Sequence, residues 1–323
     1  MLPETLPVLL LAVLLDALFG YPNWIFRKIG HPVTWIGSLI NLADRCFNRE
    51  HMPTSRRKLL GSAAILGVGG IAAAVAFIFQ LAVSEWPWGW IATSVAASTL
   101  IAGRSLYTHV AGVAEALESG GVEAGREAVA HIVGRDTNTL DEHGVGRAAI
   151  ESLAENASDG VAAPVFWFAV LGLPGLVAYR AINTADSMIG HRTPRHTAFG
   201  WASARLDDLV NLPASRLAAL VFGAAAFFAR ASPLGAFRAV IRDAHKHRSP
   251  NAGWPEAAMA GALRLRLAGP RCYGGAVVED AFMGDGRFEA TAGDIKRALR
   301  LARIGWMIMV VLIATAALVT AQV

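Results

Sequence analysis

The sequence is poor in charged residues and in cysteine. Asp, Glu, Lys and Arg make up only 17% of its 323 residues, whereas soluble domains carry about 25%. Hydrophobic residues make up 54% and the mean hydropathy is +0.43, so a membrane protein is the first expectation. The two cysteines, Cys46 and Cys272, have no metal-binding spacing and do not indicate an oxidising compartment.

Several sequence signatures of function are missing as well. The chain contains neither a GxxxxGK[ST] phosphate loop nor a GxSxG nucleophile motif, and its histidines show no zinc-binding spacing. The net charge of +4 is small, so nucleic-acid binding is not expected. The first apolar run lacks a basic segment before it and a cleavage site after it, which argues against a signal peptide.

Long apolar runs are what the sequence does contain. Residues 59–83 carry no charge over 25 positions, and residues 301–320 are interrupted only by Arg303. A helix needs about 20 apolar residues to cross a bilayer, so both runs are long enough. Shorter runs occupy 6–19, 86–103, 161–178 and 209–229. The runs predict an all-α, polytopic integral membrane protein, a single membrane-embedded domain over 1–323 with about 4–6 membrane-embedded helices.

The distribution of basic residues predicts the topology. Residues 20–58 carry seven Lys or Arg and residues 230–300 carry twelve, and such residues gather on the cytoplasmic side. The prediction therefore includes two cytoplasmic parts, a helical segment at 104–160 and a loop and helix segment at 230–300. Prolines interrupt the runs at 161–178 and 209–229, and broken helices at membrane depth must line protein or a wet cavity. We expect both runs to be broken or re-entrant, in a multi-pass protein of the cell membrane whose site faces the cytoplasm.

An acidic helix precedes the first broken run. Thr139 and Glu142 have capping-box spacing and predict a helix that ends near residue 157. Glu151, Glu155 and Asp159 are spaced i, i+4, i+8 and would share a face while the helix lasts. Either this is the solvated acidic face of an ordinary helix, or the carboxylates, with Asn156 beside them, act in catalysis or on a cation.

A second group of polar residues surrounds the two broken runs. An unpaired Asp or Arg costs about 2.5–3.5 kcal/mol at the centre of a membrane helix. These residues could be salt bridges that neutralise one another, or a site in which arginines bind phosphate and carboxylates bind Mg²⁺. The residues are Arg180, Asn183, Asp186, Arg192, Arg205, Asp207 and Asp208.

Two loops complete the set of candidates. His31 lies in a loop rich in proline and glycine, where a histidine is usually a turn residue or a cap. The string SPNAGWPE at 249–256 holds Asn251 and Glu256 and precedes an alanine-rich helix predicted over 257–267, with Pro255 near its start. Local capping and a loop that closes over substrate are both compatible with it.

Seven strings together resemble the CobD/CbiB family, the adenosylcobinamide-phosphate synthases of cobalamin biosynthesis. Departures are Tyr21, where the family usually has a polar residue, and the patch 196–199. The strings are DALFGYP at 16–22, HPVTWIG at 31–37, GRDT at 134–137, IESLAENASDG at 150–160, YRAINTADSMIG at 179–190, GWASARLDD at 200–208 and SPNAGWPEAAMAGAL at 249–263.

The resemblance implies an ATP- and Mg²⁺-dependent ligase. It would join (R)-1-amino-2-propanol phosphate to the free propionate carboxyl of adenosylcobyric acid, a corrinoid, beside the bilayer and possible membrane partners of the same pathway. Activation of the carboxyl, charge stabilisation and deprotonation of the amine are the tasks for the protein. Catalysis is expected from Glu151, Glu155, Asn156, Asp159, Asp207 and Asp208. Substrate binding is expected from Arg180, Asn183, Asp186, Arg192, Arg205, Asn251, Glu256 and His31, and magnesium binding from Glu155, Asp159, Asp186 and Asp208.

Two other functions are compatible with parts of the sequence. Broken apolar segments flanked by charges are also typical of transporters, although no inverted repeat is visible. A non-catalytic membrane sensor related to the same family is the other alternative. Such a sensor would not be expected to keep the acidic strings at 151–159 and 205–208 intact.

Overall fold

The computed structural model describes residues 2–191, 193–273 and 276–322, with the side chains of 2–4, 23, 271–273 and 276–278 excepted. The chain is 78% helical with almost no strands, which confirms the all-α prediction. Its residues form two compact units, and each unit is assembled from separate stretches of sequence. Residues 1–102, 163–211 and 313–323 form the first unit, and residues 103–162 and 212–312 form the second.

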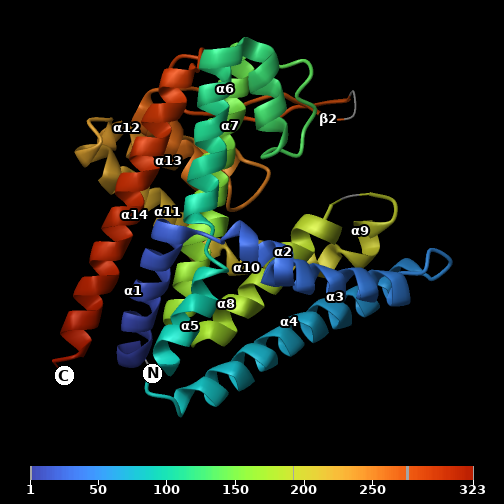
Figure 1. Cartoon of the computed structure of the whole chain (residues 1–323). Helices are drawn as coiled ribbons and strands as arrows, with labels where there is room; N and C mark the ends of the chain where they lie inside the picture. Colours follow the sequence, from blue (N-terminus) through green and yellow to red (C-terminus); the bar gives the residue numbers. More distant parts are fainter. Residues whose placement is uncertain (1, 192, 274–275, 323) are drawn as a thin grey trace. The chain divides into compact units, whose positions relative to one another are not determined.

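Among the described residues, the first unit contains helices and no strands (Figure 1). Its two longest helices are α4, which contains the uncharged run 59–83, and α8, which contains most of the apolar run 161–178. The helices are α1 (Leu2–Phe19), α2 (Asn23–Ile29), α3 (Pro32–Phe47), α4 (Thr54–Ser84), α5 (Gly89–Ser98), α8 (Ala163–Ile189), α9 (His196–Phe199), α10 (Trp201–Val210) and the last turns of α14.

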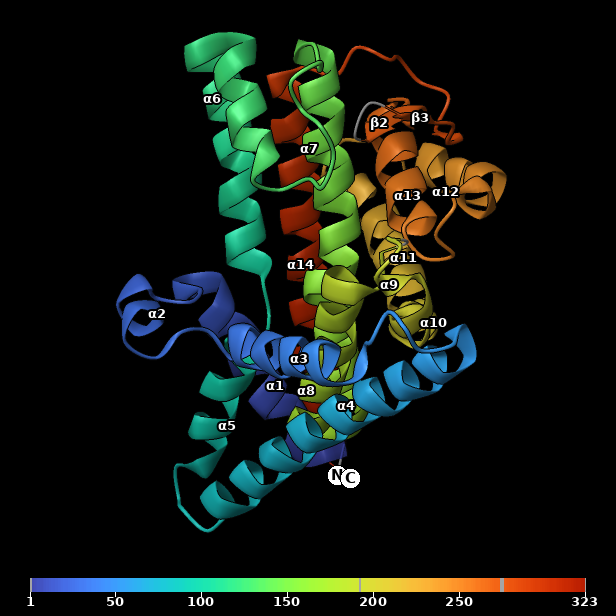
Figure 2. The ribbon, with the colours of Figure 1, turned by 90° about the vertical axis from the view of Figure 1, so that its right-hand side faces the viewer.

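The core of the first unit forms where α3, α4 and α8 meet, and Figure 2 shows α3 running beside α4. Ile36 and Ile40, one turn apart on α3, pack with Ile65 and Val68 of α4. Phe199 closes this core, and it is fully buried. Gly61 permits the close approach, because a Cβ there would lie 1.9 Å from the carbonyl oxygen of Phe199.

The second unit contains α6 and α7 side by side (Figures 1 and 2), a group of shorter helices and four short strands. Strand β1 pairs with β4 and β2 pairs with β3, both antiparallel. Its elements are α6 (Gly103–Ala130), α7 (Glu142–Ala157), the π-helix Ser158–Ala162, α11 (Leu212–Phe228), α12 (Pro233–Asp243), the 3₁₀ turn Ala244–Lys246, α13 (Gly253–Leu263), β1 (Leu267–Ala268), β2 (Arg271–Tyr273), β3 (Ala276–Val278), β4 (Phe282–Met283) and most of α14 (Ala292–Thr320).

Helix α13 lies at the centre of the second unit. It is almost entirely buried, and its small residues let α12 approach: a Cβ on Gly261 would lie 2.2 Å from the carbonyl oxygen of Gly235. The helix begins and ends four residues earlier in the sequence than the predicted range 257–267. It begins at Gly253 and ends at Leu263, because Arg264 adopts a left-handed conformation with φ 56°.

A buried carboxylate joins α12 to the strand β4. Asp243 accepts hydrogen bonds from the Nε and Nη2 of Arg242, from Lys246 Nζ at 2.9 Å and from the backbone N–H of Gly284 at 2.9 Å. Burial alone would raise the pKa of Asp243, but the hydrogen bonds from Arg242, Lys246 and Gly284 lower it to about 2. The carboxylate is therefore charged at neutral pH and fixes the turn after β4.

Three helical segments within the described residues are long and apolar enough to cross a membrane, and up to five if each bent pair counts as one span. The three are Thr54–Ser84, Glu142–Ile189 and Ala292–Thr320. The two runs predicted to be broken are both interrupted. The run 161–178 follows a π-helix and contains Gly172 with φ 66°, and the run 209–229 bends by 43° between α10 and α11. This chain is an α-helical membrane protein.

Candidate functional site

Eight of the predicted site residues gather in two clusters, one in each unit. Glu151, Glu155, Asn156 and Glu256 line one small cavity in the second unit, which we call the Glu151 pocket. Asn183, Asp186, Asp207 and Asp208 gather in the first unit, and we call them the Asn183 cluster. Each is described separately below.

Helix α7 supplies most of the Glu151 pocket. The helix begins as the sequence predicts, but its N-cap is Asp141 rather than Thr139, since the Asp141 side chain accepts from the N–H of Gly144 at 2.6 Å. The pocket has a volume of about 110 Å³, enough for a small polar group. Its lining residues are Ile132, Val133, Gly134, Arg135, Ala148, Glu151, Ser152, Glu155, Asn156 and Glu256.

Glu151 is buried and paired, so a solvated acidic face does not describe it. Its Oε2 lies 3.2 Å from Nη2 of Arg135, and both side chains are close to fully covered. Its Oε1 accepts a hydrogen bond of 2.8 Å from the backbone N–H of Ala268. The carboxylate therefore joins α7 to the loop before it and to strand β1.

The other polar residues of α7 stand in different environments. Asn156 is exposed, and its Nδ2 donates to the carbonyl oxygen of Ser152 at 2.9 Å, which orients the amide. Glu155 is exposed at the pocket. Asp159 lies beyond the end of α7 in the π-helix Ser158–Ala162, so its face does not continue in simple α-helical phase with Glu151 and Glu155. The predicted i, i+4, i+8 face is correct only for the first two residues.

Asn251 lies in the loop between α12 and α13, and Glu256 lies in the first turn of α13. Glu256 is 1% exposed, and its Oε1 lies 3.8 Å from Nε2 of His247. The backbone N–H of Ser249 donates to the other ring nitrogen of His247 at 3.0 Å. Asn251 is buried, and its Oδ1 accepts from Ser215 and from Arg216 at 2.9 Å. Asn251 thus ties the loop to α11, and it does not cap α13, whose N-cap Ala252 has no side-chain cap hydrogen bond.

The Asn183 cluster joins α8 to α10 in the first unit. Asn183 Nδ2 donates to Oδ1 of Asp207 at 3.1 Å, and nearby Asn211 accepts a hydrogen bond of 2.9 Å from the hydroxyl of Tyr179. Asp186 lies close enough to Asp207 and Asp208 for their charges to interact. The sequence positions 183–186 and 207–208 are therefore neighbours in space.

The two arginines of the first unit have different settings. Arg205 pairs with Asp208 one turn away at 3.2 Å, and it is more than half exposed. This pair matches the salt-bridge alternative, and such exposed pairs contribute little to stability. Arg180 donates through Nε to the carbonyl oxygen of Leu100 at 2.7 Å. The positive charge of Arg180 also interacts with His31. The side chain of His31 caps α3 by accepting a hydrogen bond from the N–H of Val33 at 3.2 Å.

One predicted site residue cannot be placed, and two residues that were not predicted join the candidates. Arg192 lies outside the described residues. Arg135 and His247 are additional functional candidates, because they contact Glu151 and Glu256. Arg135 stands within the string GRDT, and that string is the signal that could have identified it. His247 has no such signal, since only the fold brings it to Glu256.

A metal site made by the protein alone requires several donor side chains close together. No group of three or more His, Cys, Asp or Glu side chains that could hold a metal ion occurs among the described residues. In the Glu151 pocket, both oxygens of Glu151 already have partners. Magnesium, however, usually keeps several waters and binds through one or two carboxylates and substrate phosphates. The predicted ligands Glu155 and Asp159 lie in the second unit and Asp186 and Asp208 in the first, so magnesium binding by these residues stays a prediction.

Comparison with known proteins settles the family. The sequence model of the family described as "CobD/Cbib protein" matches residues 9–302. The chain belongs to the CobD/CbiB family. A protein named "Cobalamin biosynthesis protein CobD" from Sinorhizobium sp is 51% identical over 292 residues, covering 89% of this chain and 90% of its own. Relatives of the same name from Rhizobium meliloti (47% identical, 98% of both chains) and Rhodobacter capsulatus (46% identical, 92% of both) are also similar. No solved structure matches the chain.

The family assignment confirms the resemblance carried by the seven strings. Five of the seven contribute to the two clusters: GRDT, IESLAENASDG and SPNAGWPE supply the Glu151 pocket and its loop, while YRAINTADSMIG and GWASARLDD supply the Asn183 cluster.

Proposed function

We propose that this protein is a membrane-embedded enzyme of cobalamin biosynthesis that forms an amide. In this proposal it joins (R)-1-amino-2-propanol phosphate, or aminopropanol itself, to the free propionate carboxyl of adenosylcobyric acid, and the product is adenosylcobinamide phosphate. The names of the relatives support the pathway. The observation that supports the chemistry is the Glu151 pocket, where an arginine and three glutamates meet in a space for one small polar group.

Arg135 is the proposed anion-binding residue of this pocket. Its Nη2 pairs with Glu151, while its buried Nε donates no hydrogen bond to any described residue. Buried donors are almost always satisfied in folded proteins, and a guanidinium edge suits a carboxylate or phosphate oxygen. We therefore assign this donor to the substrate, where negative charge develops as the amide forms.

Glu155 is the proposed general base. The amine must lose a proton to attack the activated carboxyl, and a carboxylate at hydrogen-bond reach can accept it. Glu155 is the exposed carboxylate of the pocket, whereas Glu151 is held by Arg135 and Glu256 is almost fully buried beside His247. Asn156, oriented by Ser152, is placed to hydrogen-bond the same substrate.

Activation of the carboxyl requires a co-substrate, because a carboxylate is a poor electrophile at neutral pH. ATP with Mg²⁺ would supply this activation when bound. That part of the proposal comes from the family resemblance, since the chain contains no nucleotide loop. The proposed phosphate ligands are Arg180 and Arg205 of the first unit. The proposed magnesium ligands are Asp186 and Asp208 within the first unit and Asp159 within the second, and Glu155 is reserved for the role of base.

The experiment that tests the function combines genetics with a purified enzyme. Deletion of the gene should produce a strain whose growth is rescued by cobinamide but not by cobyric acid. The purified full chain, supplied with adenosylcobyric acid, ATP, Mg²⁺ and either amine, should form the amide product seen by mass spectrometry. Rescue by cobyric acid would place the protein earlier in the pathway, and substrate flux into proteoliposomes without product would favour a transporter.

The proposed orientation is a cytoplasmic site, because ATP is cytoplasmic. Single cysteines at Thr197 and Ser249, with Cys46 and Cys272 replaced by Ala, should be labelled by a membrane-impermeant maleimide only from the cytoplasmic side. Labelling of position 197 from the outside would contradict this orientation for the Asn183 cluster, while leaving the proposal for the Glu151 pocket to its own test.

A further inference from the structure

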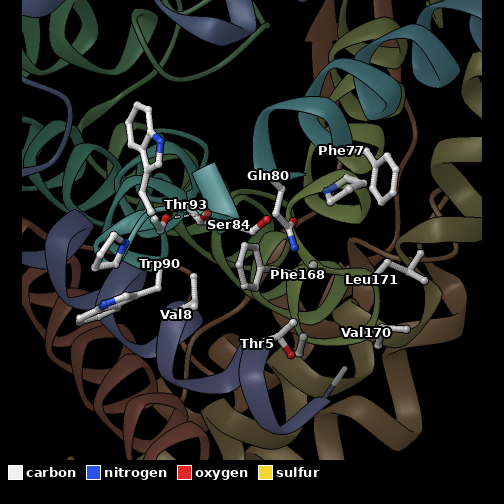
Figure 3. A pocket seen from close by; sticks show the side chains of 16 residues that line it. Thr5, Val8, Phe77, Gln80, Ser84, Trp90, Thr93, Phe168, Val170 and Leu171 are labelled. Carbon is white, nitrogen blue, oxygen red and sulfur yellow. Dashed lines mark hydrogen bonds between the residues drawn. The ribbon is translucent and has the colours of Figure 1, made fainter. Parts of the chain in front are cut away.

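A large cavity in the first unit lies among α1, α4, α5 and α8, and none of the site residues above lines it. Its volume is about 480 Å³. Figure 3 shows Gln80, Phe168 and Trp90 on its walls, with Thr5 and Val8 contributed by α1. All sixteen lining residues are uncharged, so the cavity is suited neither to a nucleotide nor to the anionic substrates of the proposed reaction.

Gln80 is the unusual residue of this cavity. It lies within α4, the 31-residue helix that is apolar enough to cross a membrane. The Oε1 of Gln80 is buried and accepts no hydrogen bond from any described residue. A polar group at this depth is costly without a partner. The amide lies against the break in α8, since a Cβ on Gly172 would be in ordinary van der Waals contact with Oε1, at 3.6 Å.

Aromatic residues surround the amide and place the cavity at the membrane surface. Trp86 and Trp90 line the cavity together with Phe77 and Phe168. Trp86, Trp88 and Trp90 lie within the six residues after α4 ends, and their exposed fractions are 65%, 71% and 47%. Exposed tryptophans gather where the bilayer meets water. The cavity therefore combines an unsatisfied acceptor with aromatic faces at headgroup depth.

We propose that this cavity binds the headgroup of phosphatidylethanolamine. Its ammonium would donate an N–H to Oε1 of Gln80, and the aromatic side chains of the lining would favour its positive charge, since aromatic faces attract cations. The acyl chains would follow the exposed side chains of Val170 and Leu171 at the rim. The uncharged lining disfavours anionic headgroups, and the choline headgroup carries no N–H to donate to Gln80.

The test uses the purified full chain in nanodiscs of phosphatidylcholine that contain a small fraction of a second lipid. The second lipid is phosphatidylethanolamine or its N-monomethyl, N-dimethyl or N-trimethyl (choline) form, in each case with acyl chains of a different mass from those of the matrix lipid. Native mass spectrometry then measures how much of this second lipid stays bound. We expect retention until the last N–H is removed, and about tenfold weaker binding of the fully methylated lipid, the value of one hydrogen bond to a charged group. Equal retention of all four lipids would overturn the proposal.

Two variants and a matched control separate the cavity from the general membrane surface. Gln80→Leu keeps the apolar character of α4 and should remove the preference between the four lipids, and Trp90→Leu should weaken retention of phosphatidylethanolamine. Trp88→Leu changes a neighbouring, more exposed tryptophan that does not line the cavity, and it should change nothing. Equal losses at positions 88 and 90 would contradict the assignment, as would competition by free ethanolamine as effective as the lipid, which would indicate a soluble amine.

Discussion

The ion pair between Arg135 and Glu151 allows structural and catalytic roles to be separated. At 3.2 Å between nitrogen and oxygen, the Coulomb attraction is about 5 kcal/mol for an effective dielectric constant of about 20. Desolvation of both groups offsets much of this, but removal of one partner leaves the other charge buried and costs about 3–5 kcal/mol. Glu151→Gln should therefore destabilise the second unit strongly, although Gln can still accept from the N–H of Ala268.

A double-mutant cycle measures the coupling. Glu151→Gln and Arg135→Met should each lower the thermal midpoint of the detergent-solubilised protein. The double variant should recover much of the loss, with a coupling energy of about 2–3 kcal/mol. Activity should not recover with stability, because the proposal assigns Nε of Arg135 to the substrate. Additive losses of stability would refute the ion-pair reasoning, and an active double variant would refute the role of Arg135 in binding substrate.

Three further predictions concern single residues. Glu155→Gln should abolish amide formation while expression and membrane insertion stay normal, and near-normal turnover in a product assay would leave Glu155 as an ordinary surface carboxylate. Arg180→Lys and Arg205→Lys keep the charge but lose the bidentate fork, so each should raise KM for aminopropanol phosphate more than for aminopropanol; equal effects on both amines would rule out phosphate binding. The pKa of Asp243 is lowered to about 2, so its charged form stabilises the fold by about 2 kcal/mol above the ordinary Asp pKa near 4, and this stabilisation is lost as pH falls from about 4 to about 2. Asp243→Asn should therefore remove the fall in thermal midpoint between pH 4 and pH 2. An unchanged pH dependence of the thermal midpoint would contradict the assignment.

Local features of the sequence predicted the helices well. The uncharged run 59–83 lies within α4, and the start of α7 was within a few residues of the capping signal at 139–142. The four short strands were not predicted, since segments of two or three residues are too short to show alternation. The end of α13 was also misplaced, because the conformation of Arg264 depends on its tertiary surroundings and not on helix propensity.

The sequence by itself determined membrane residence and family, because both rest on composition and on contiguous strings. It also selected polar residues as site candidates, and their role stays a prediction. Only the tertiary structure decided the partners: Glu151 pairs with Arg135 because the loop after α6 folds back along α7, and Asn183 meets Asp207 because α10 packs on α8. Burial of Glu151 and of Gln80 Oε1 is likewise a property of packed helices, since spacing gives the face of a helix but not the surface that covers it.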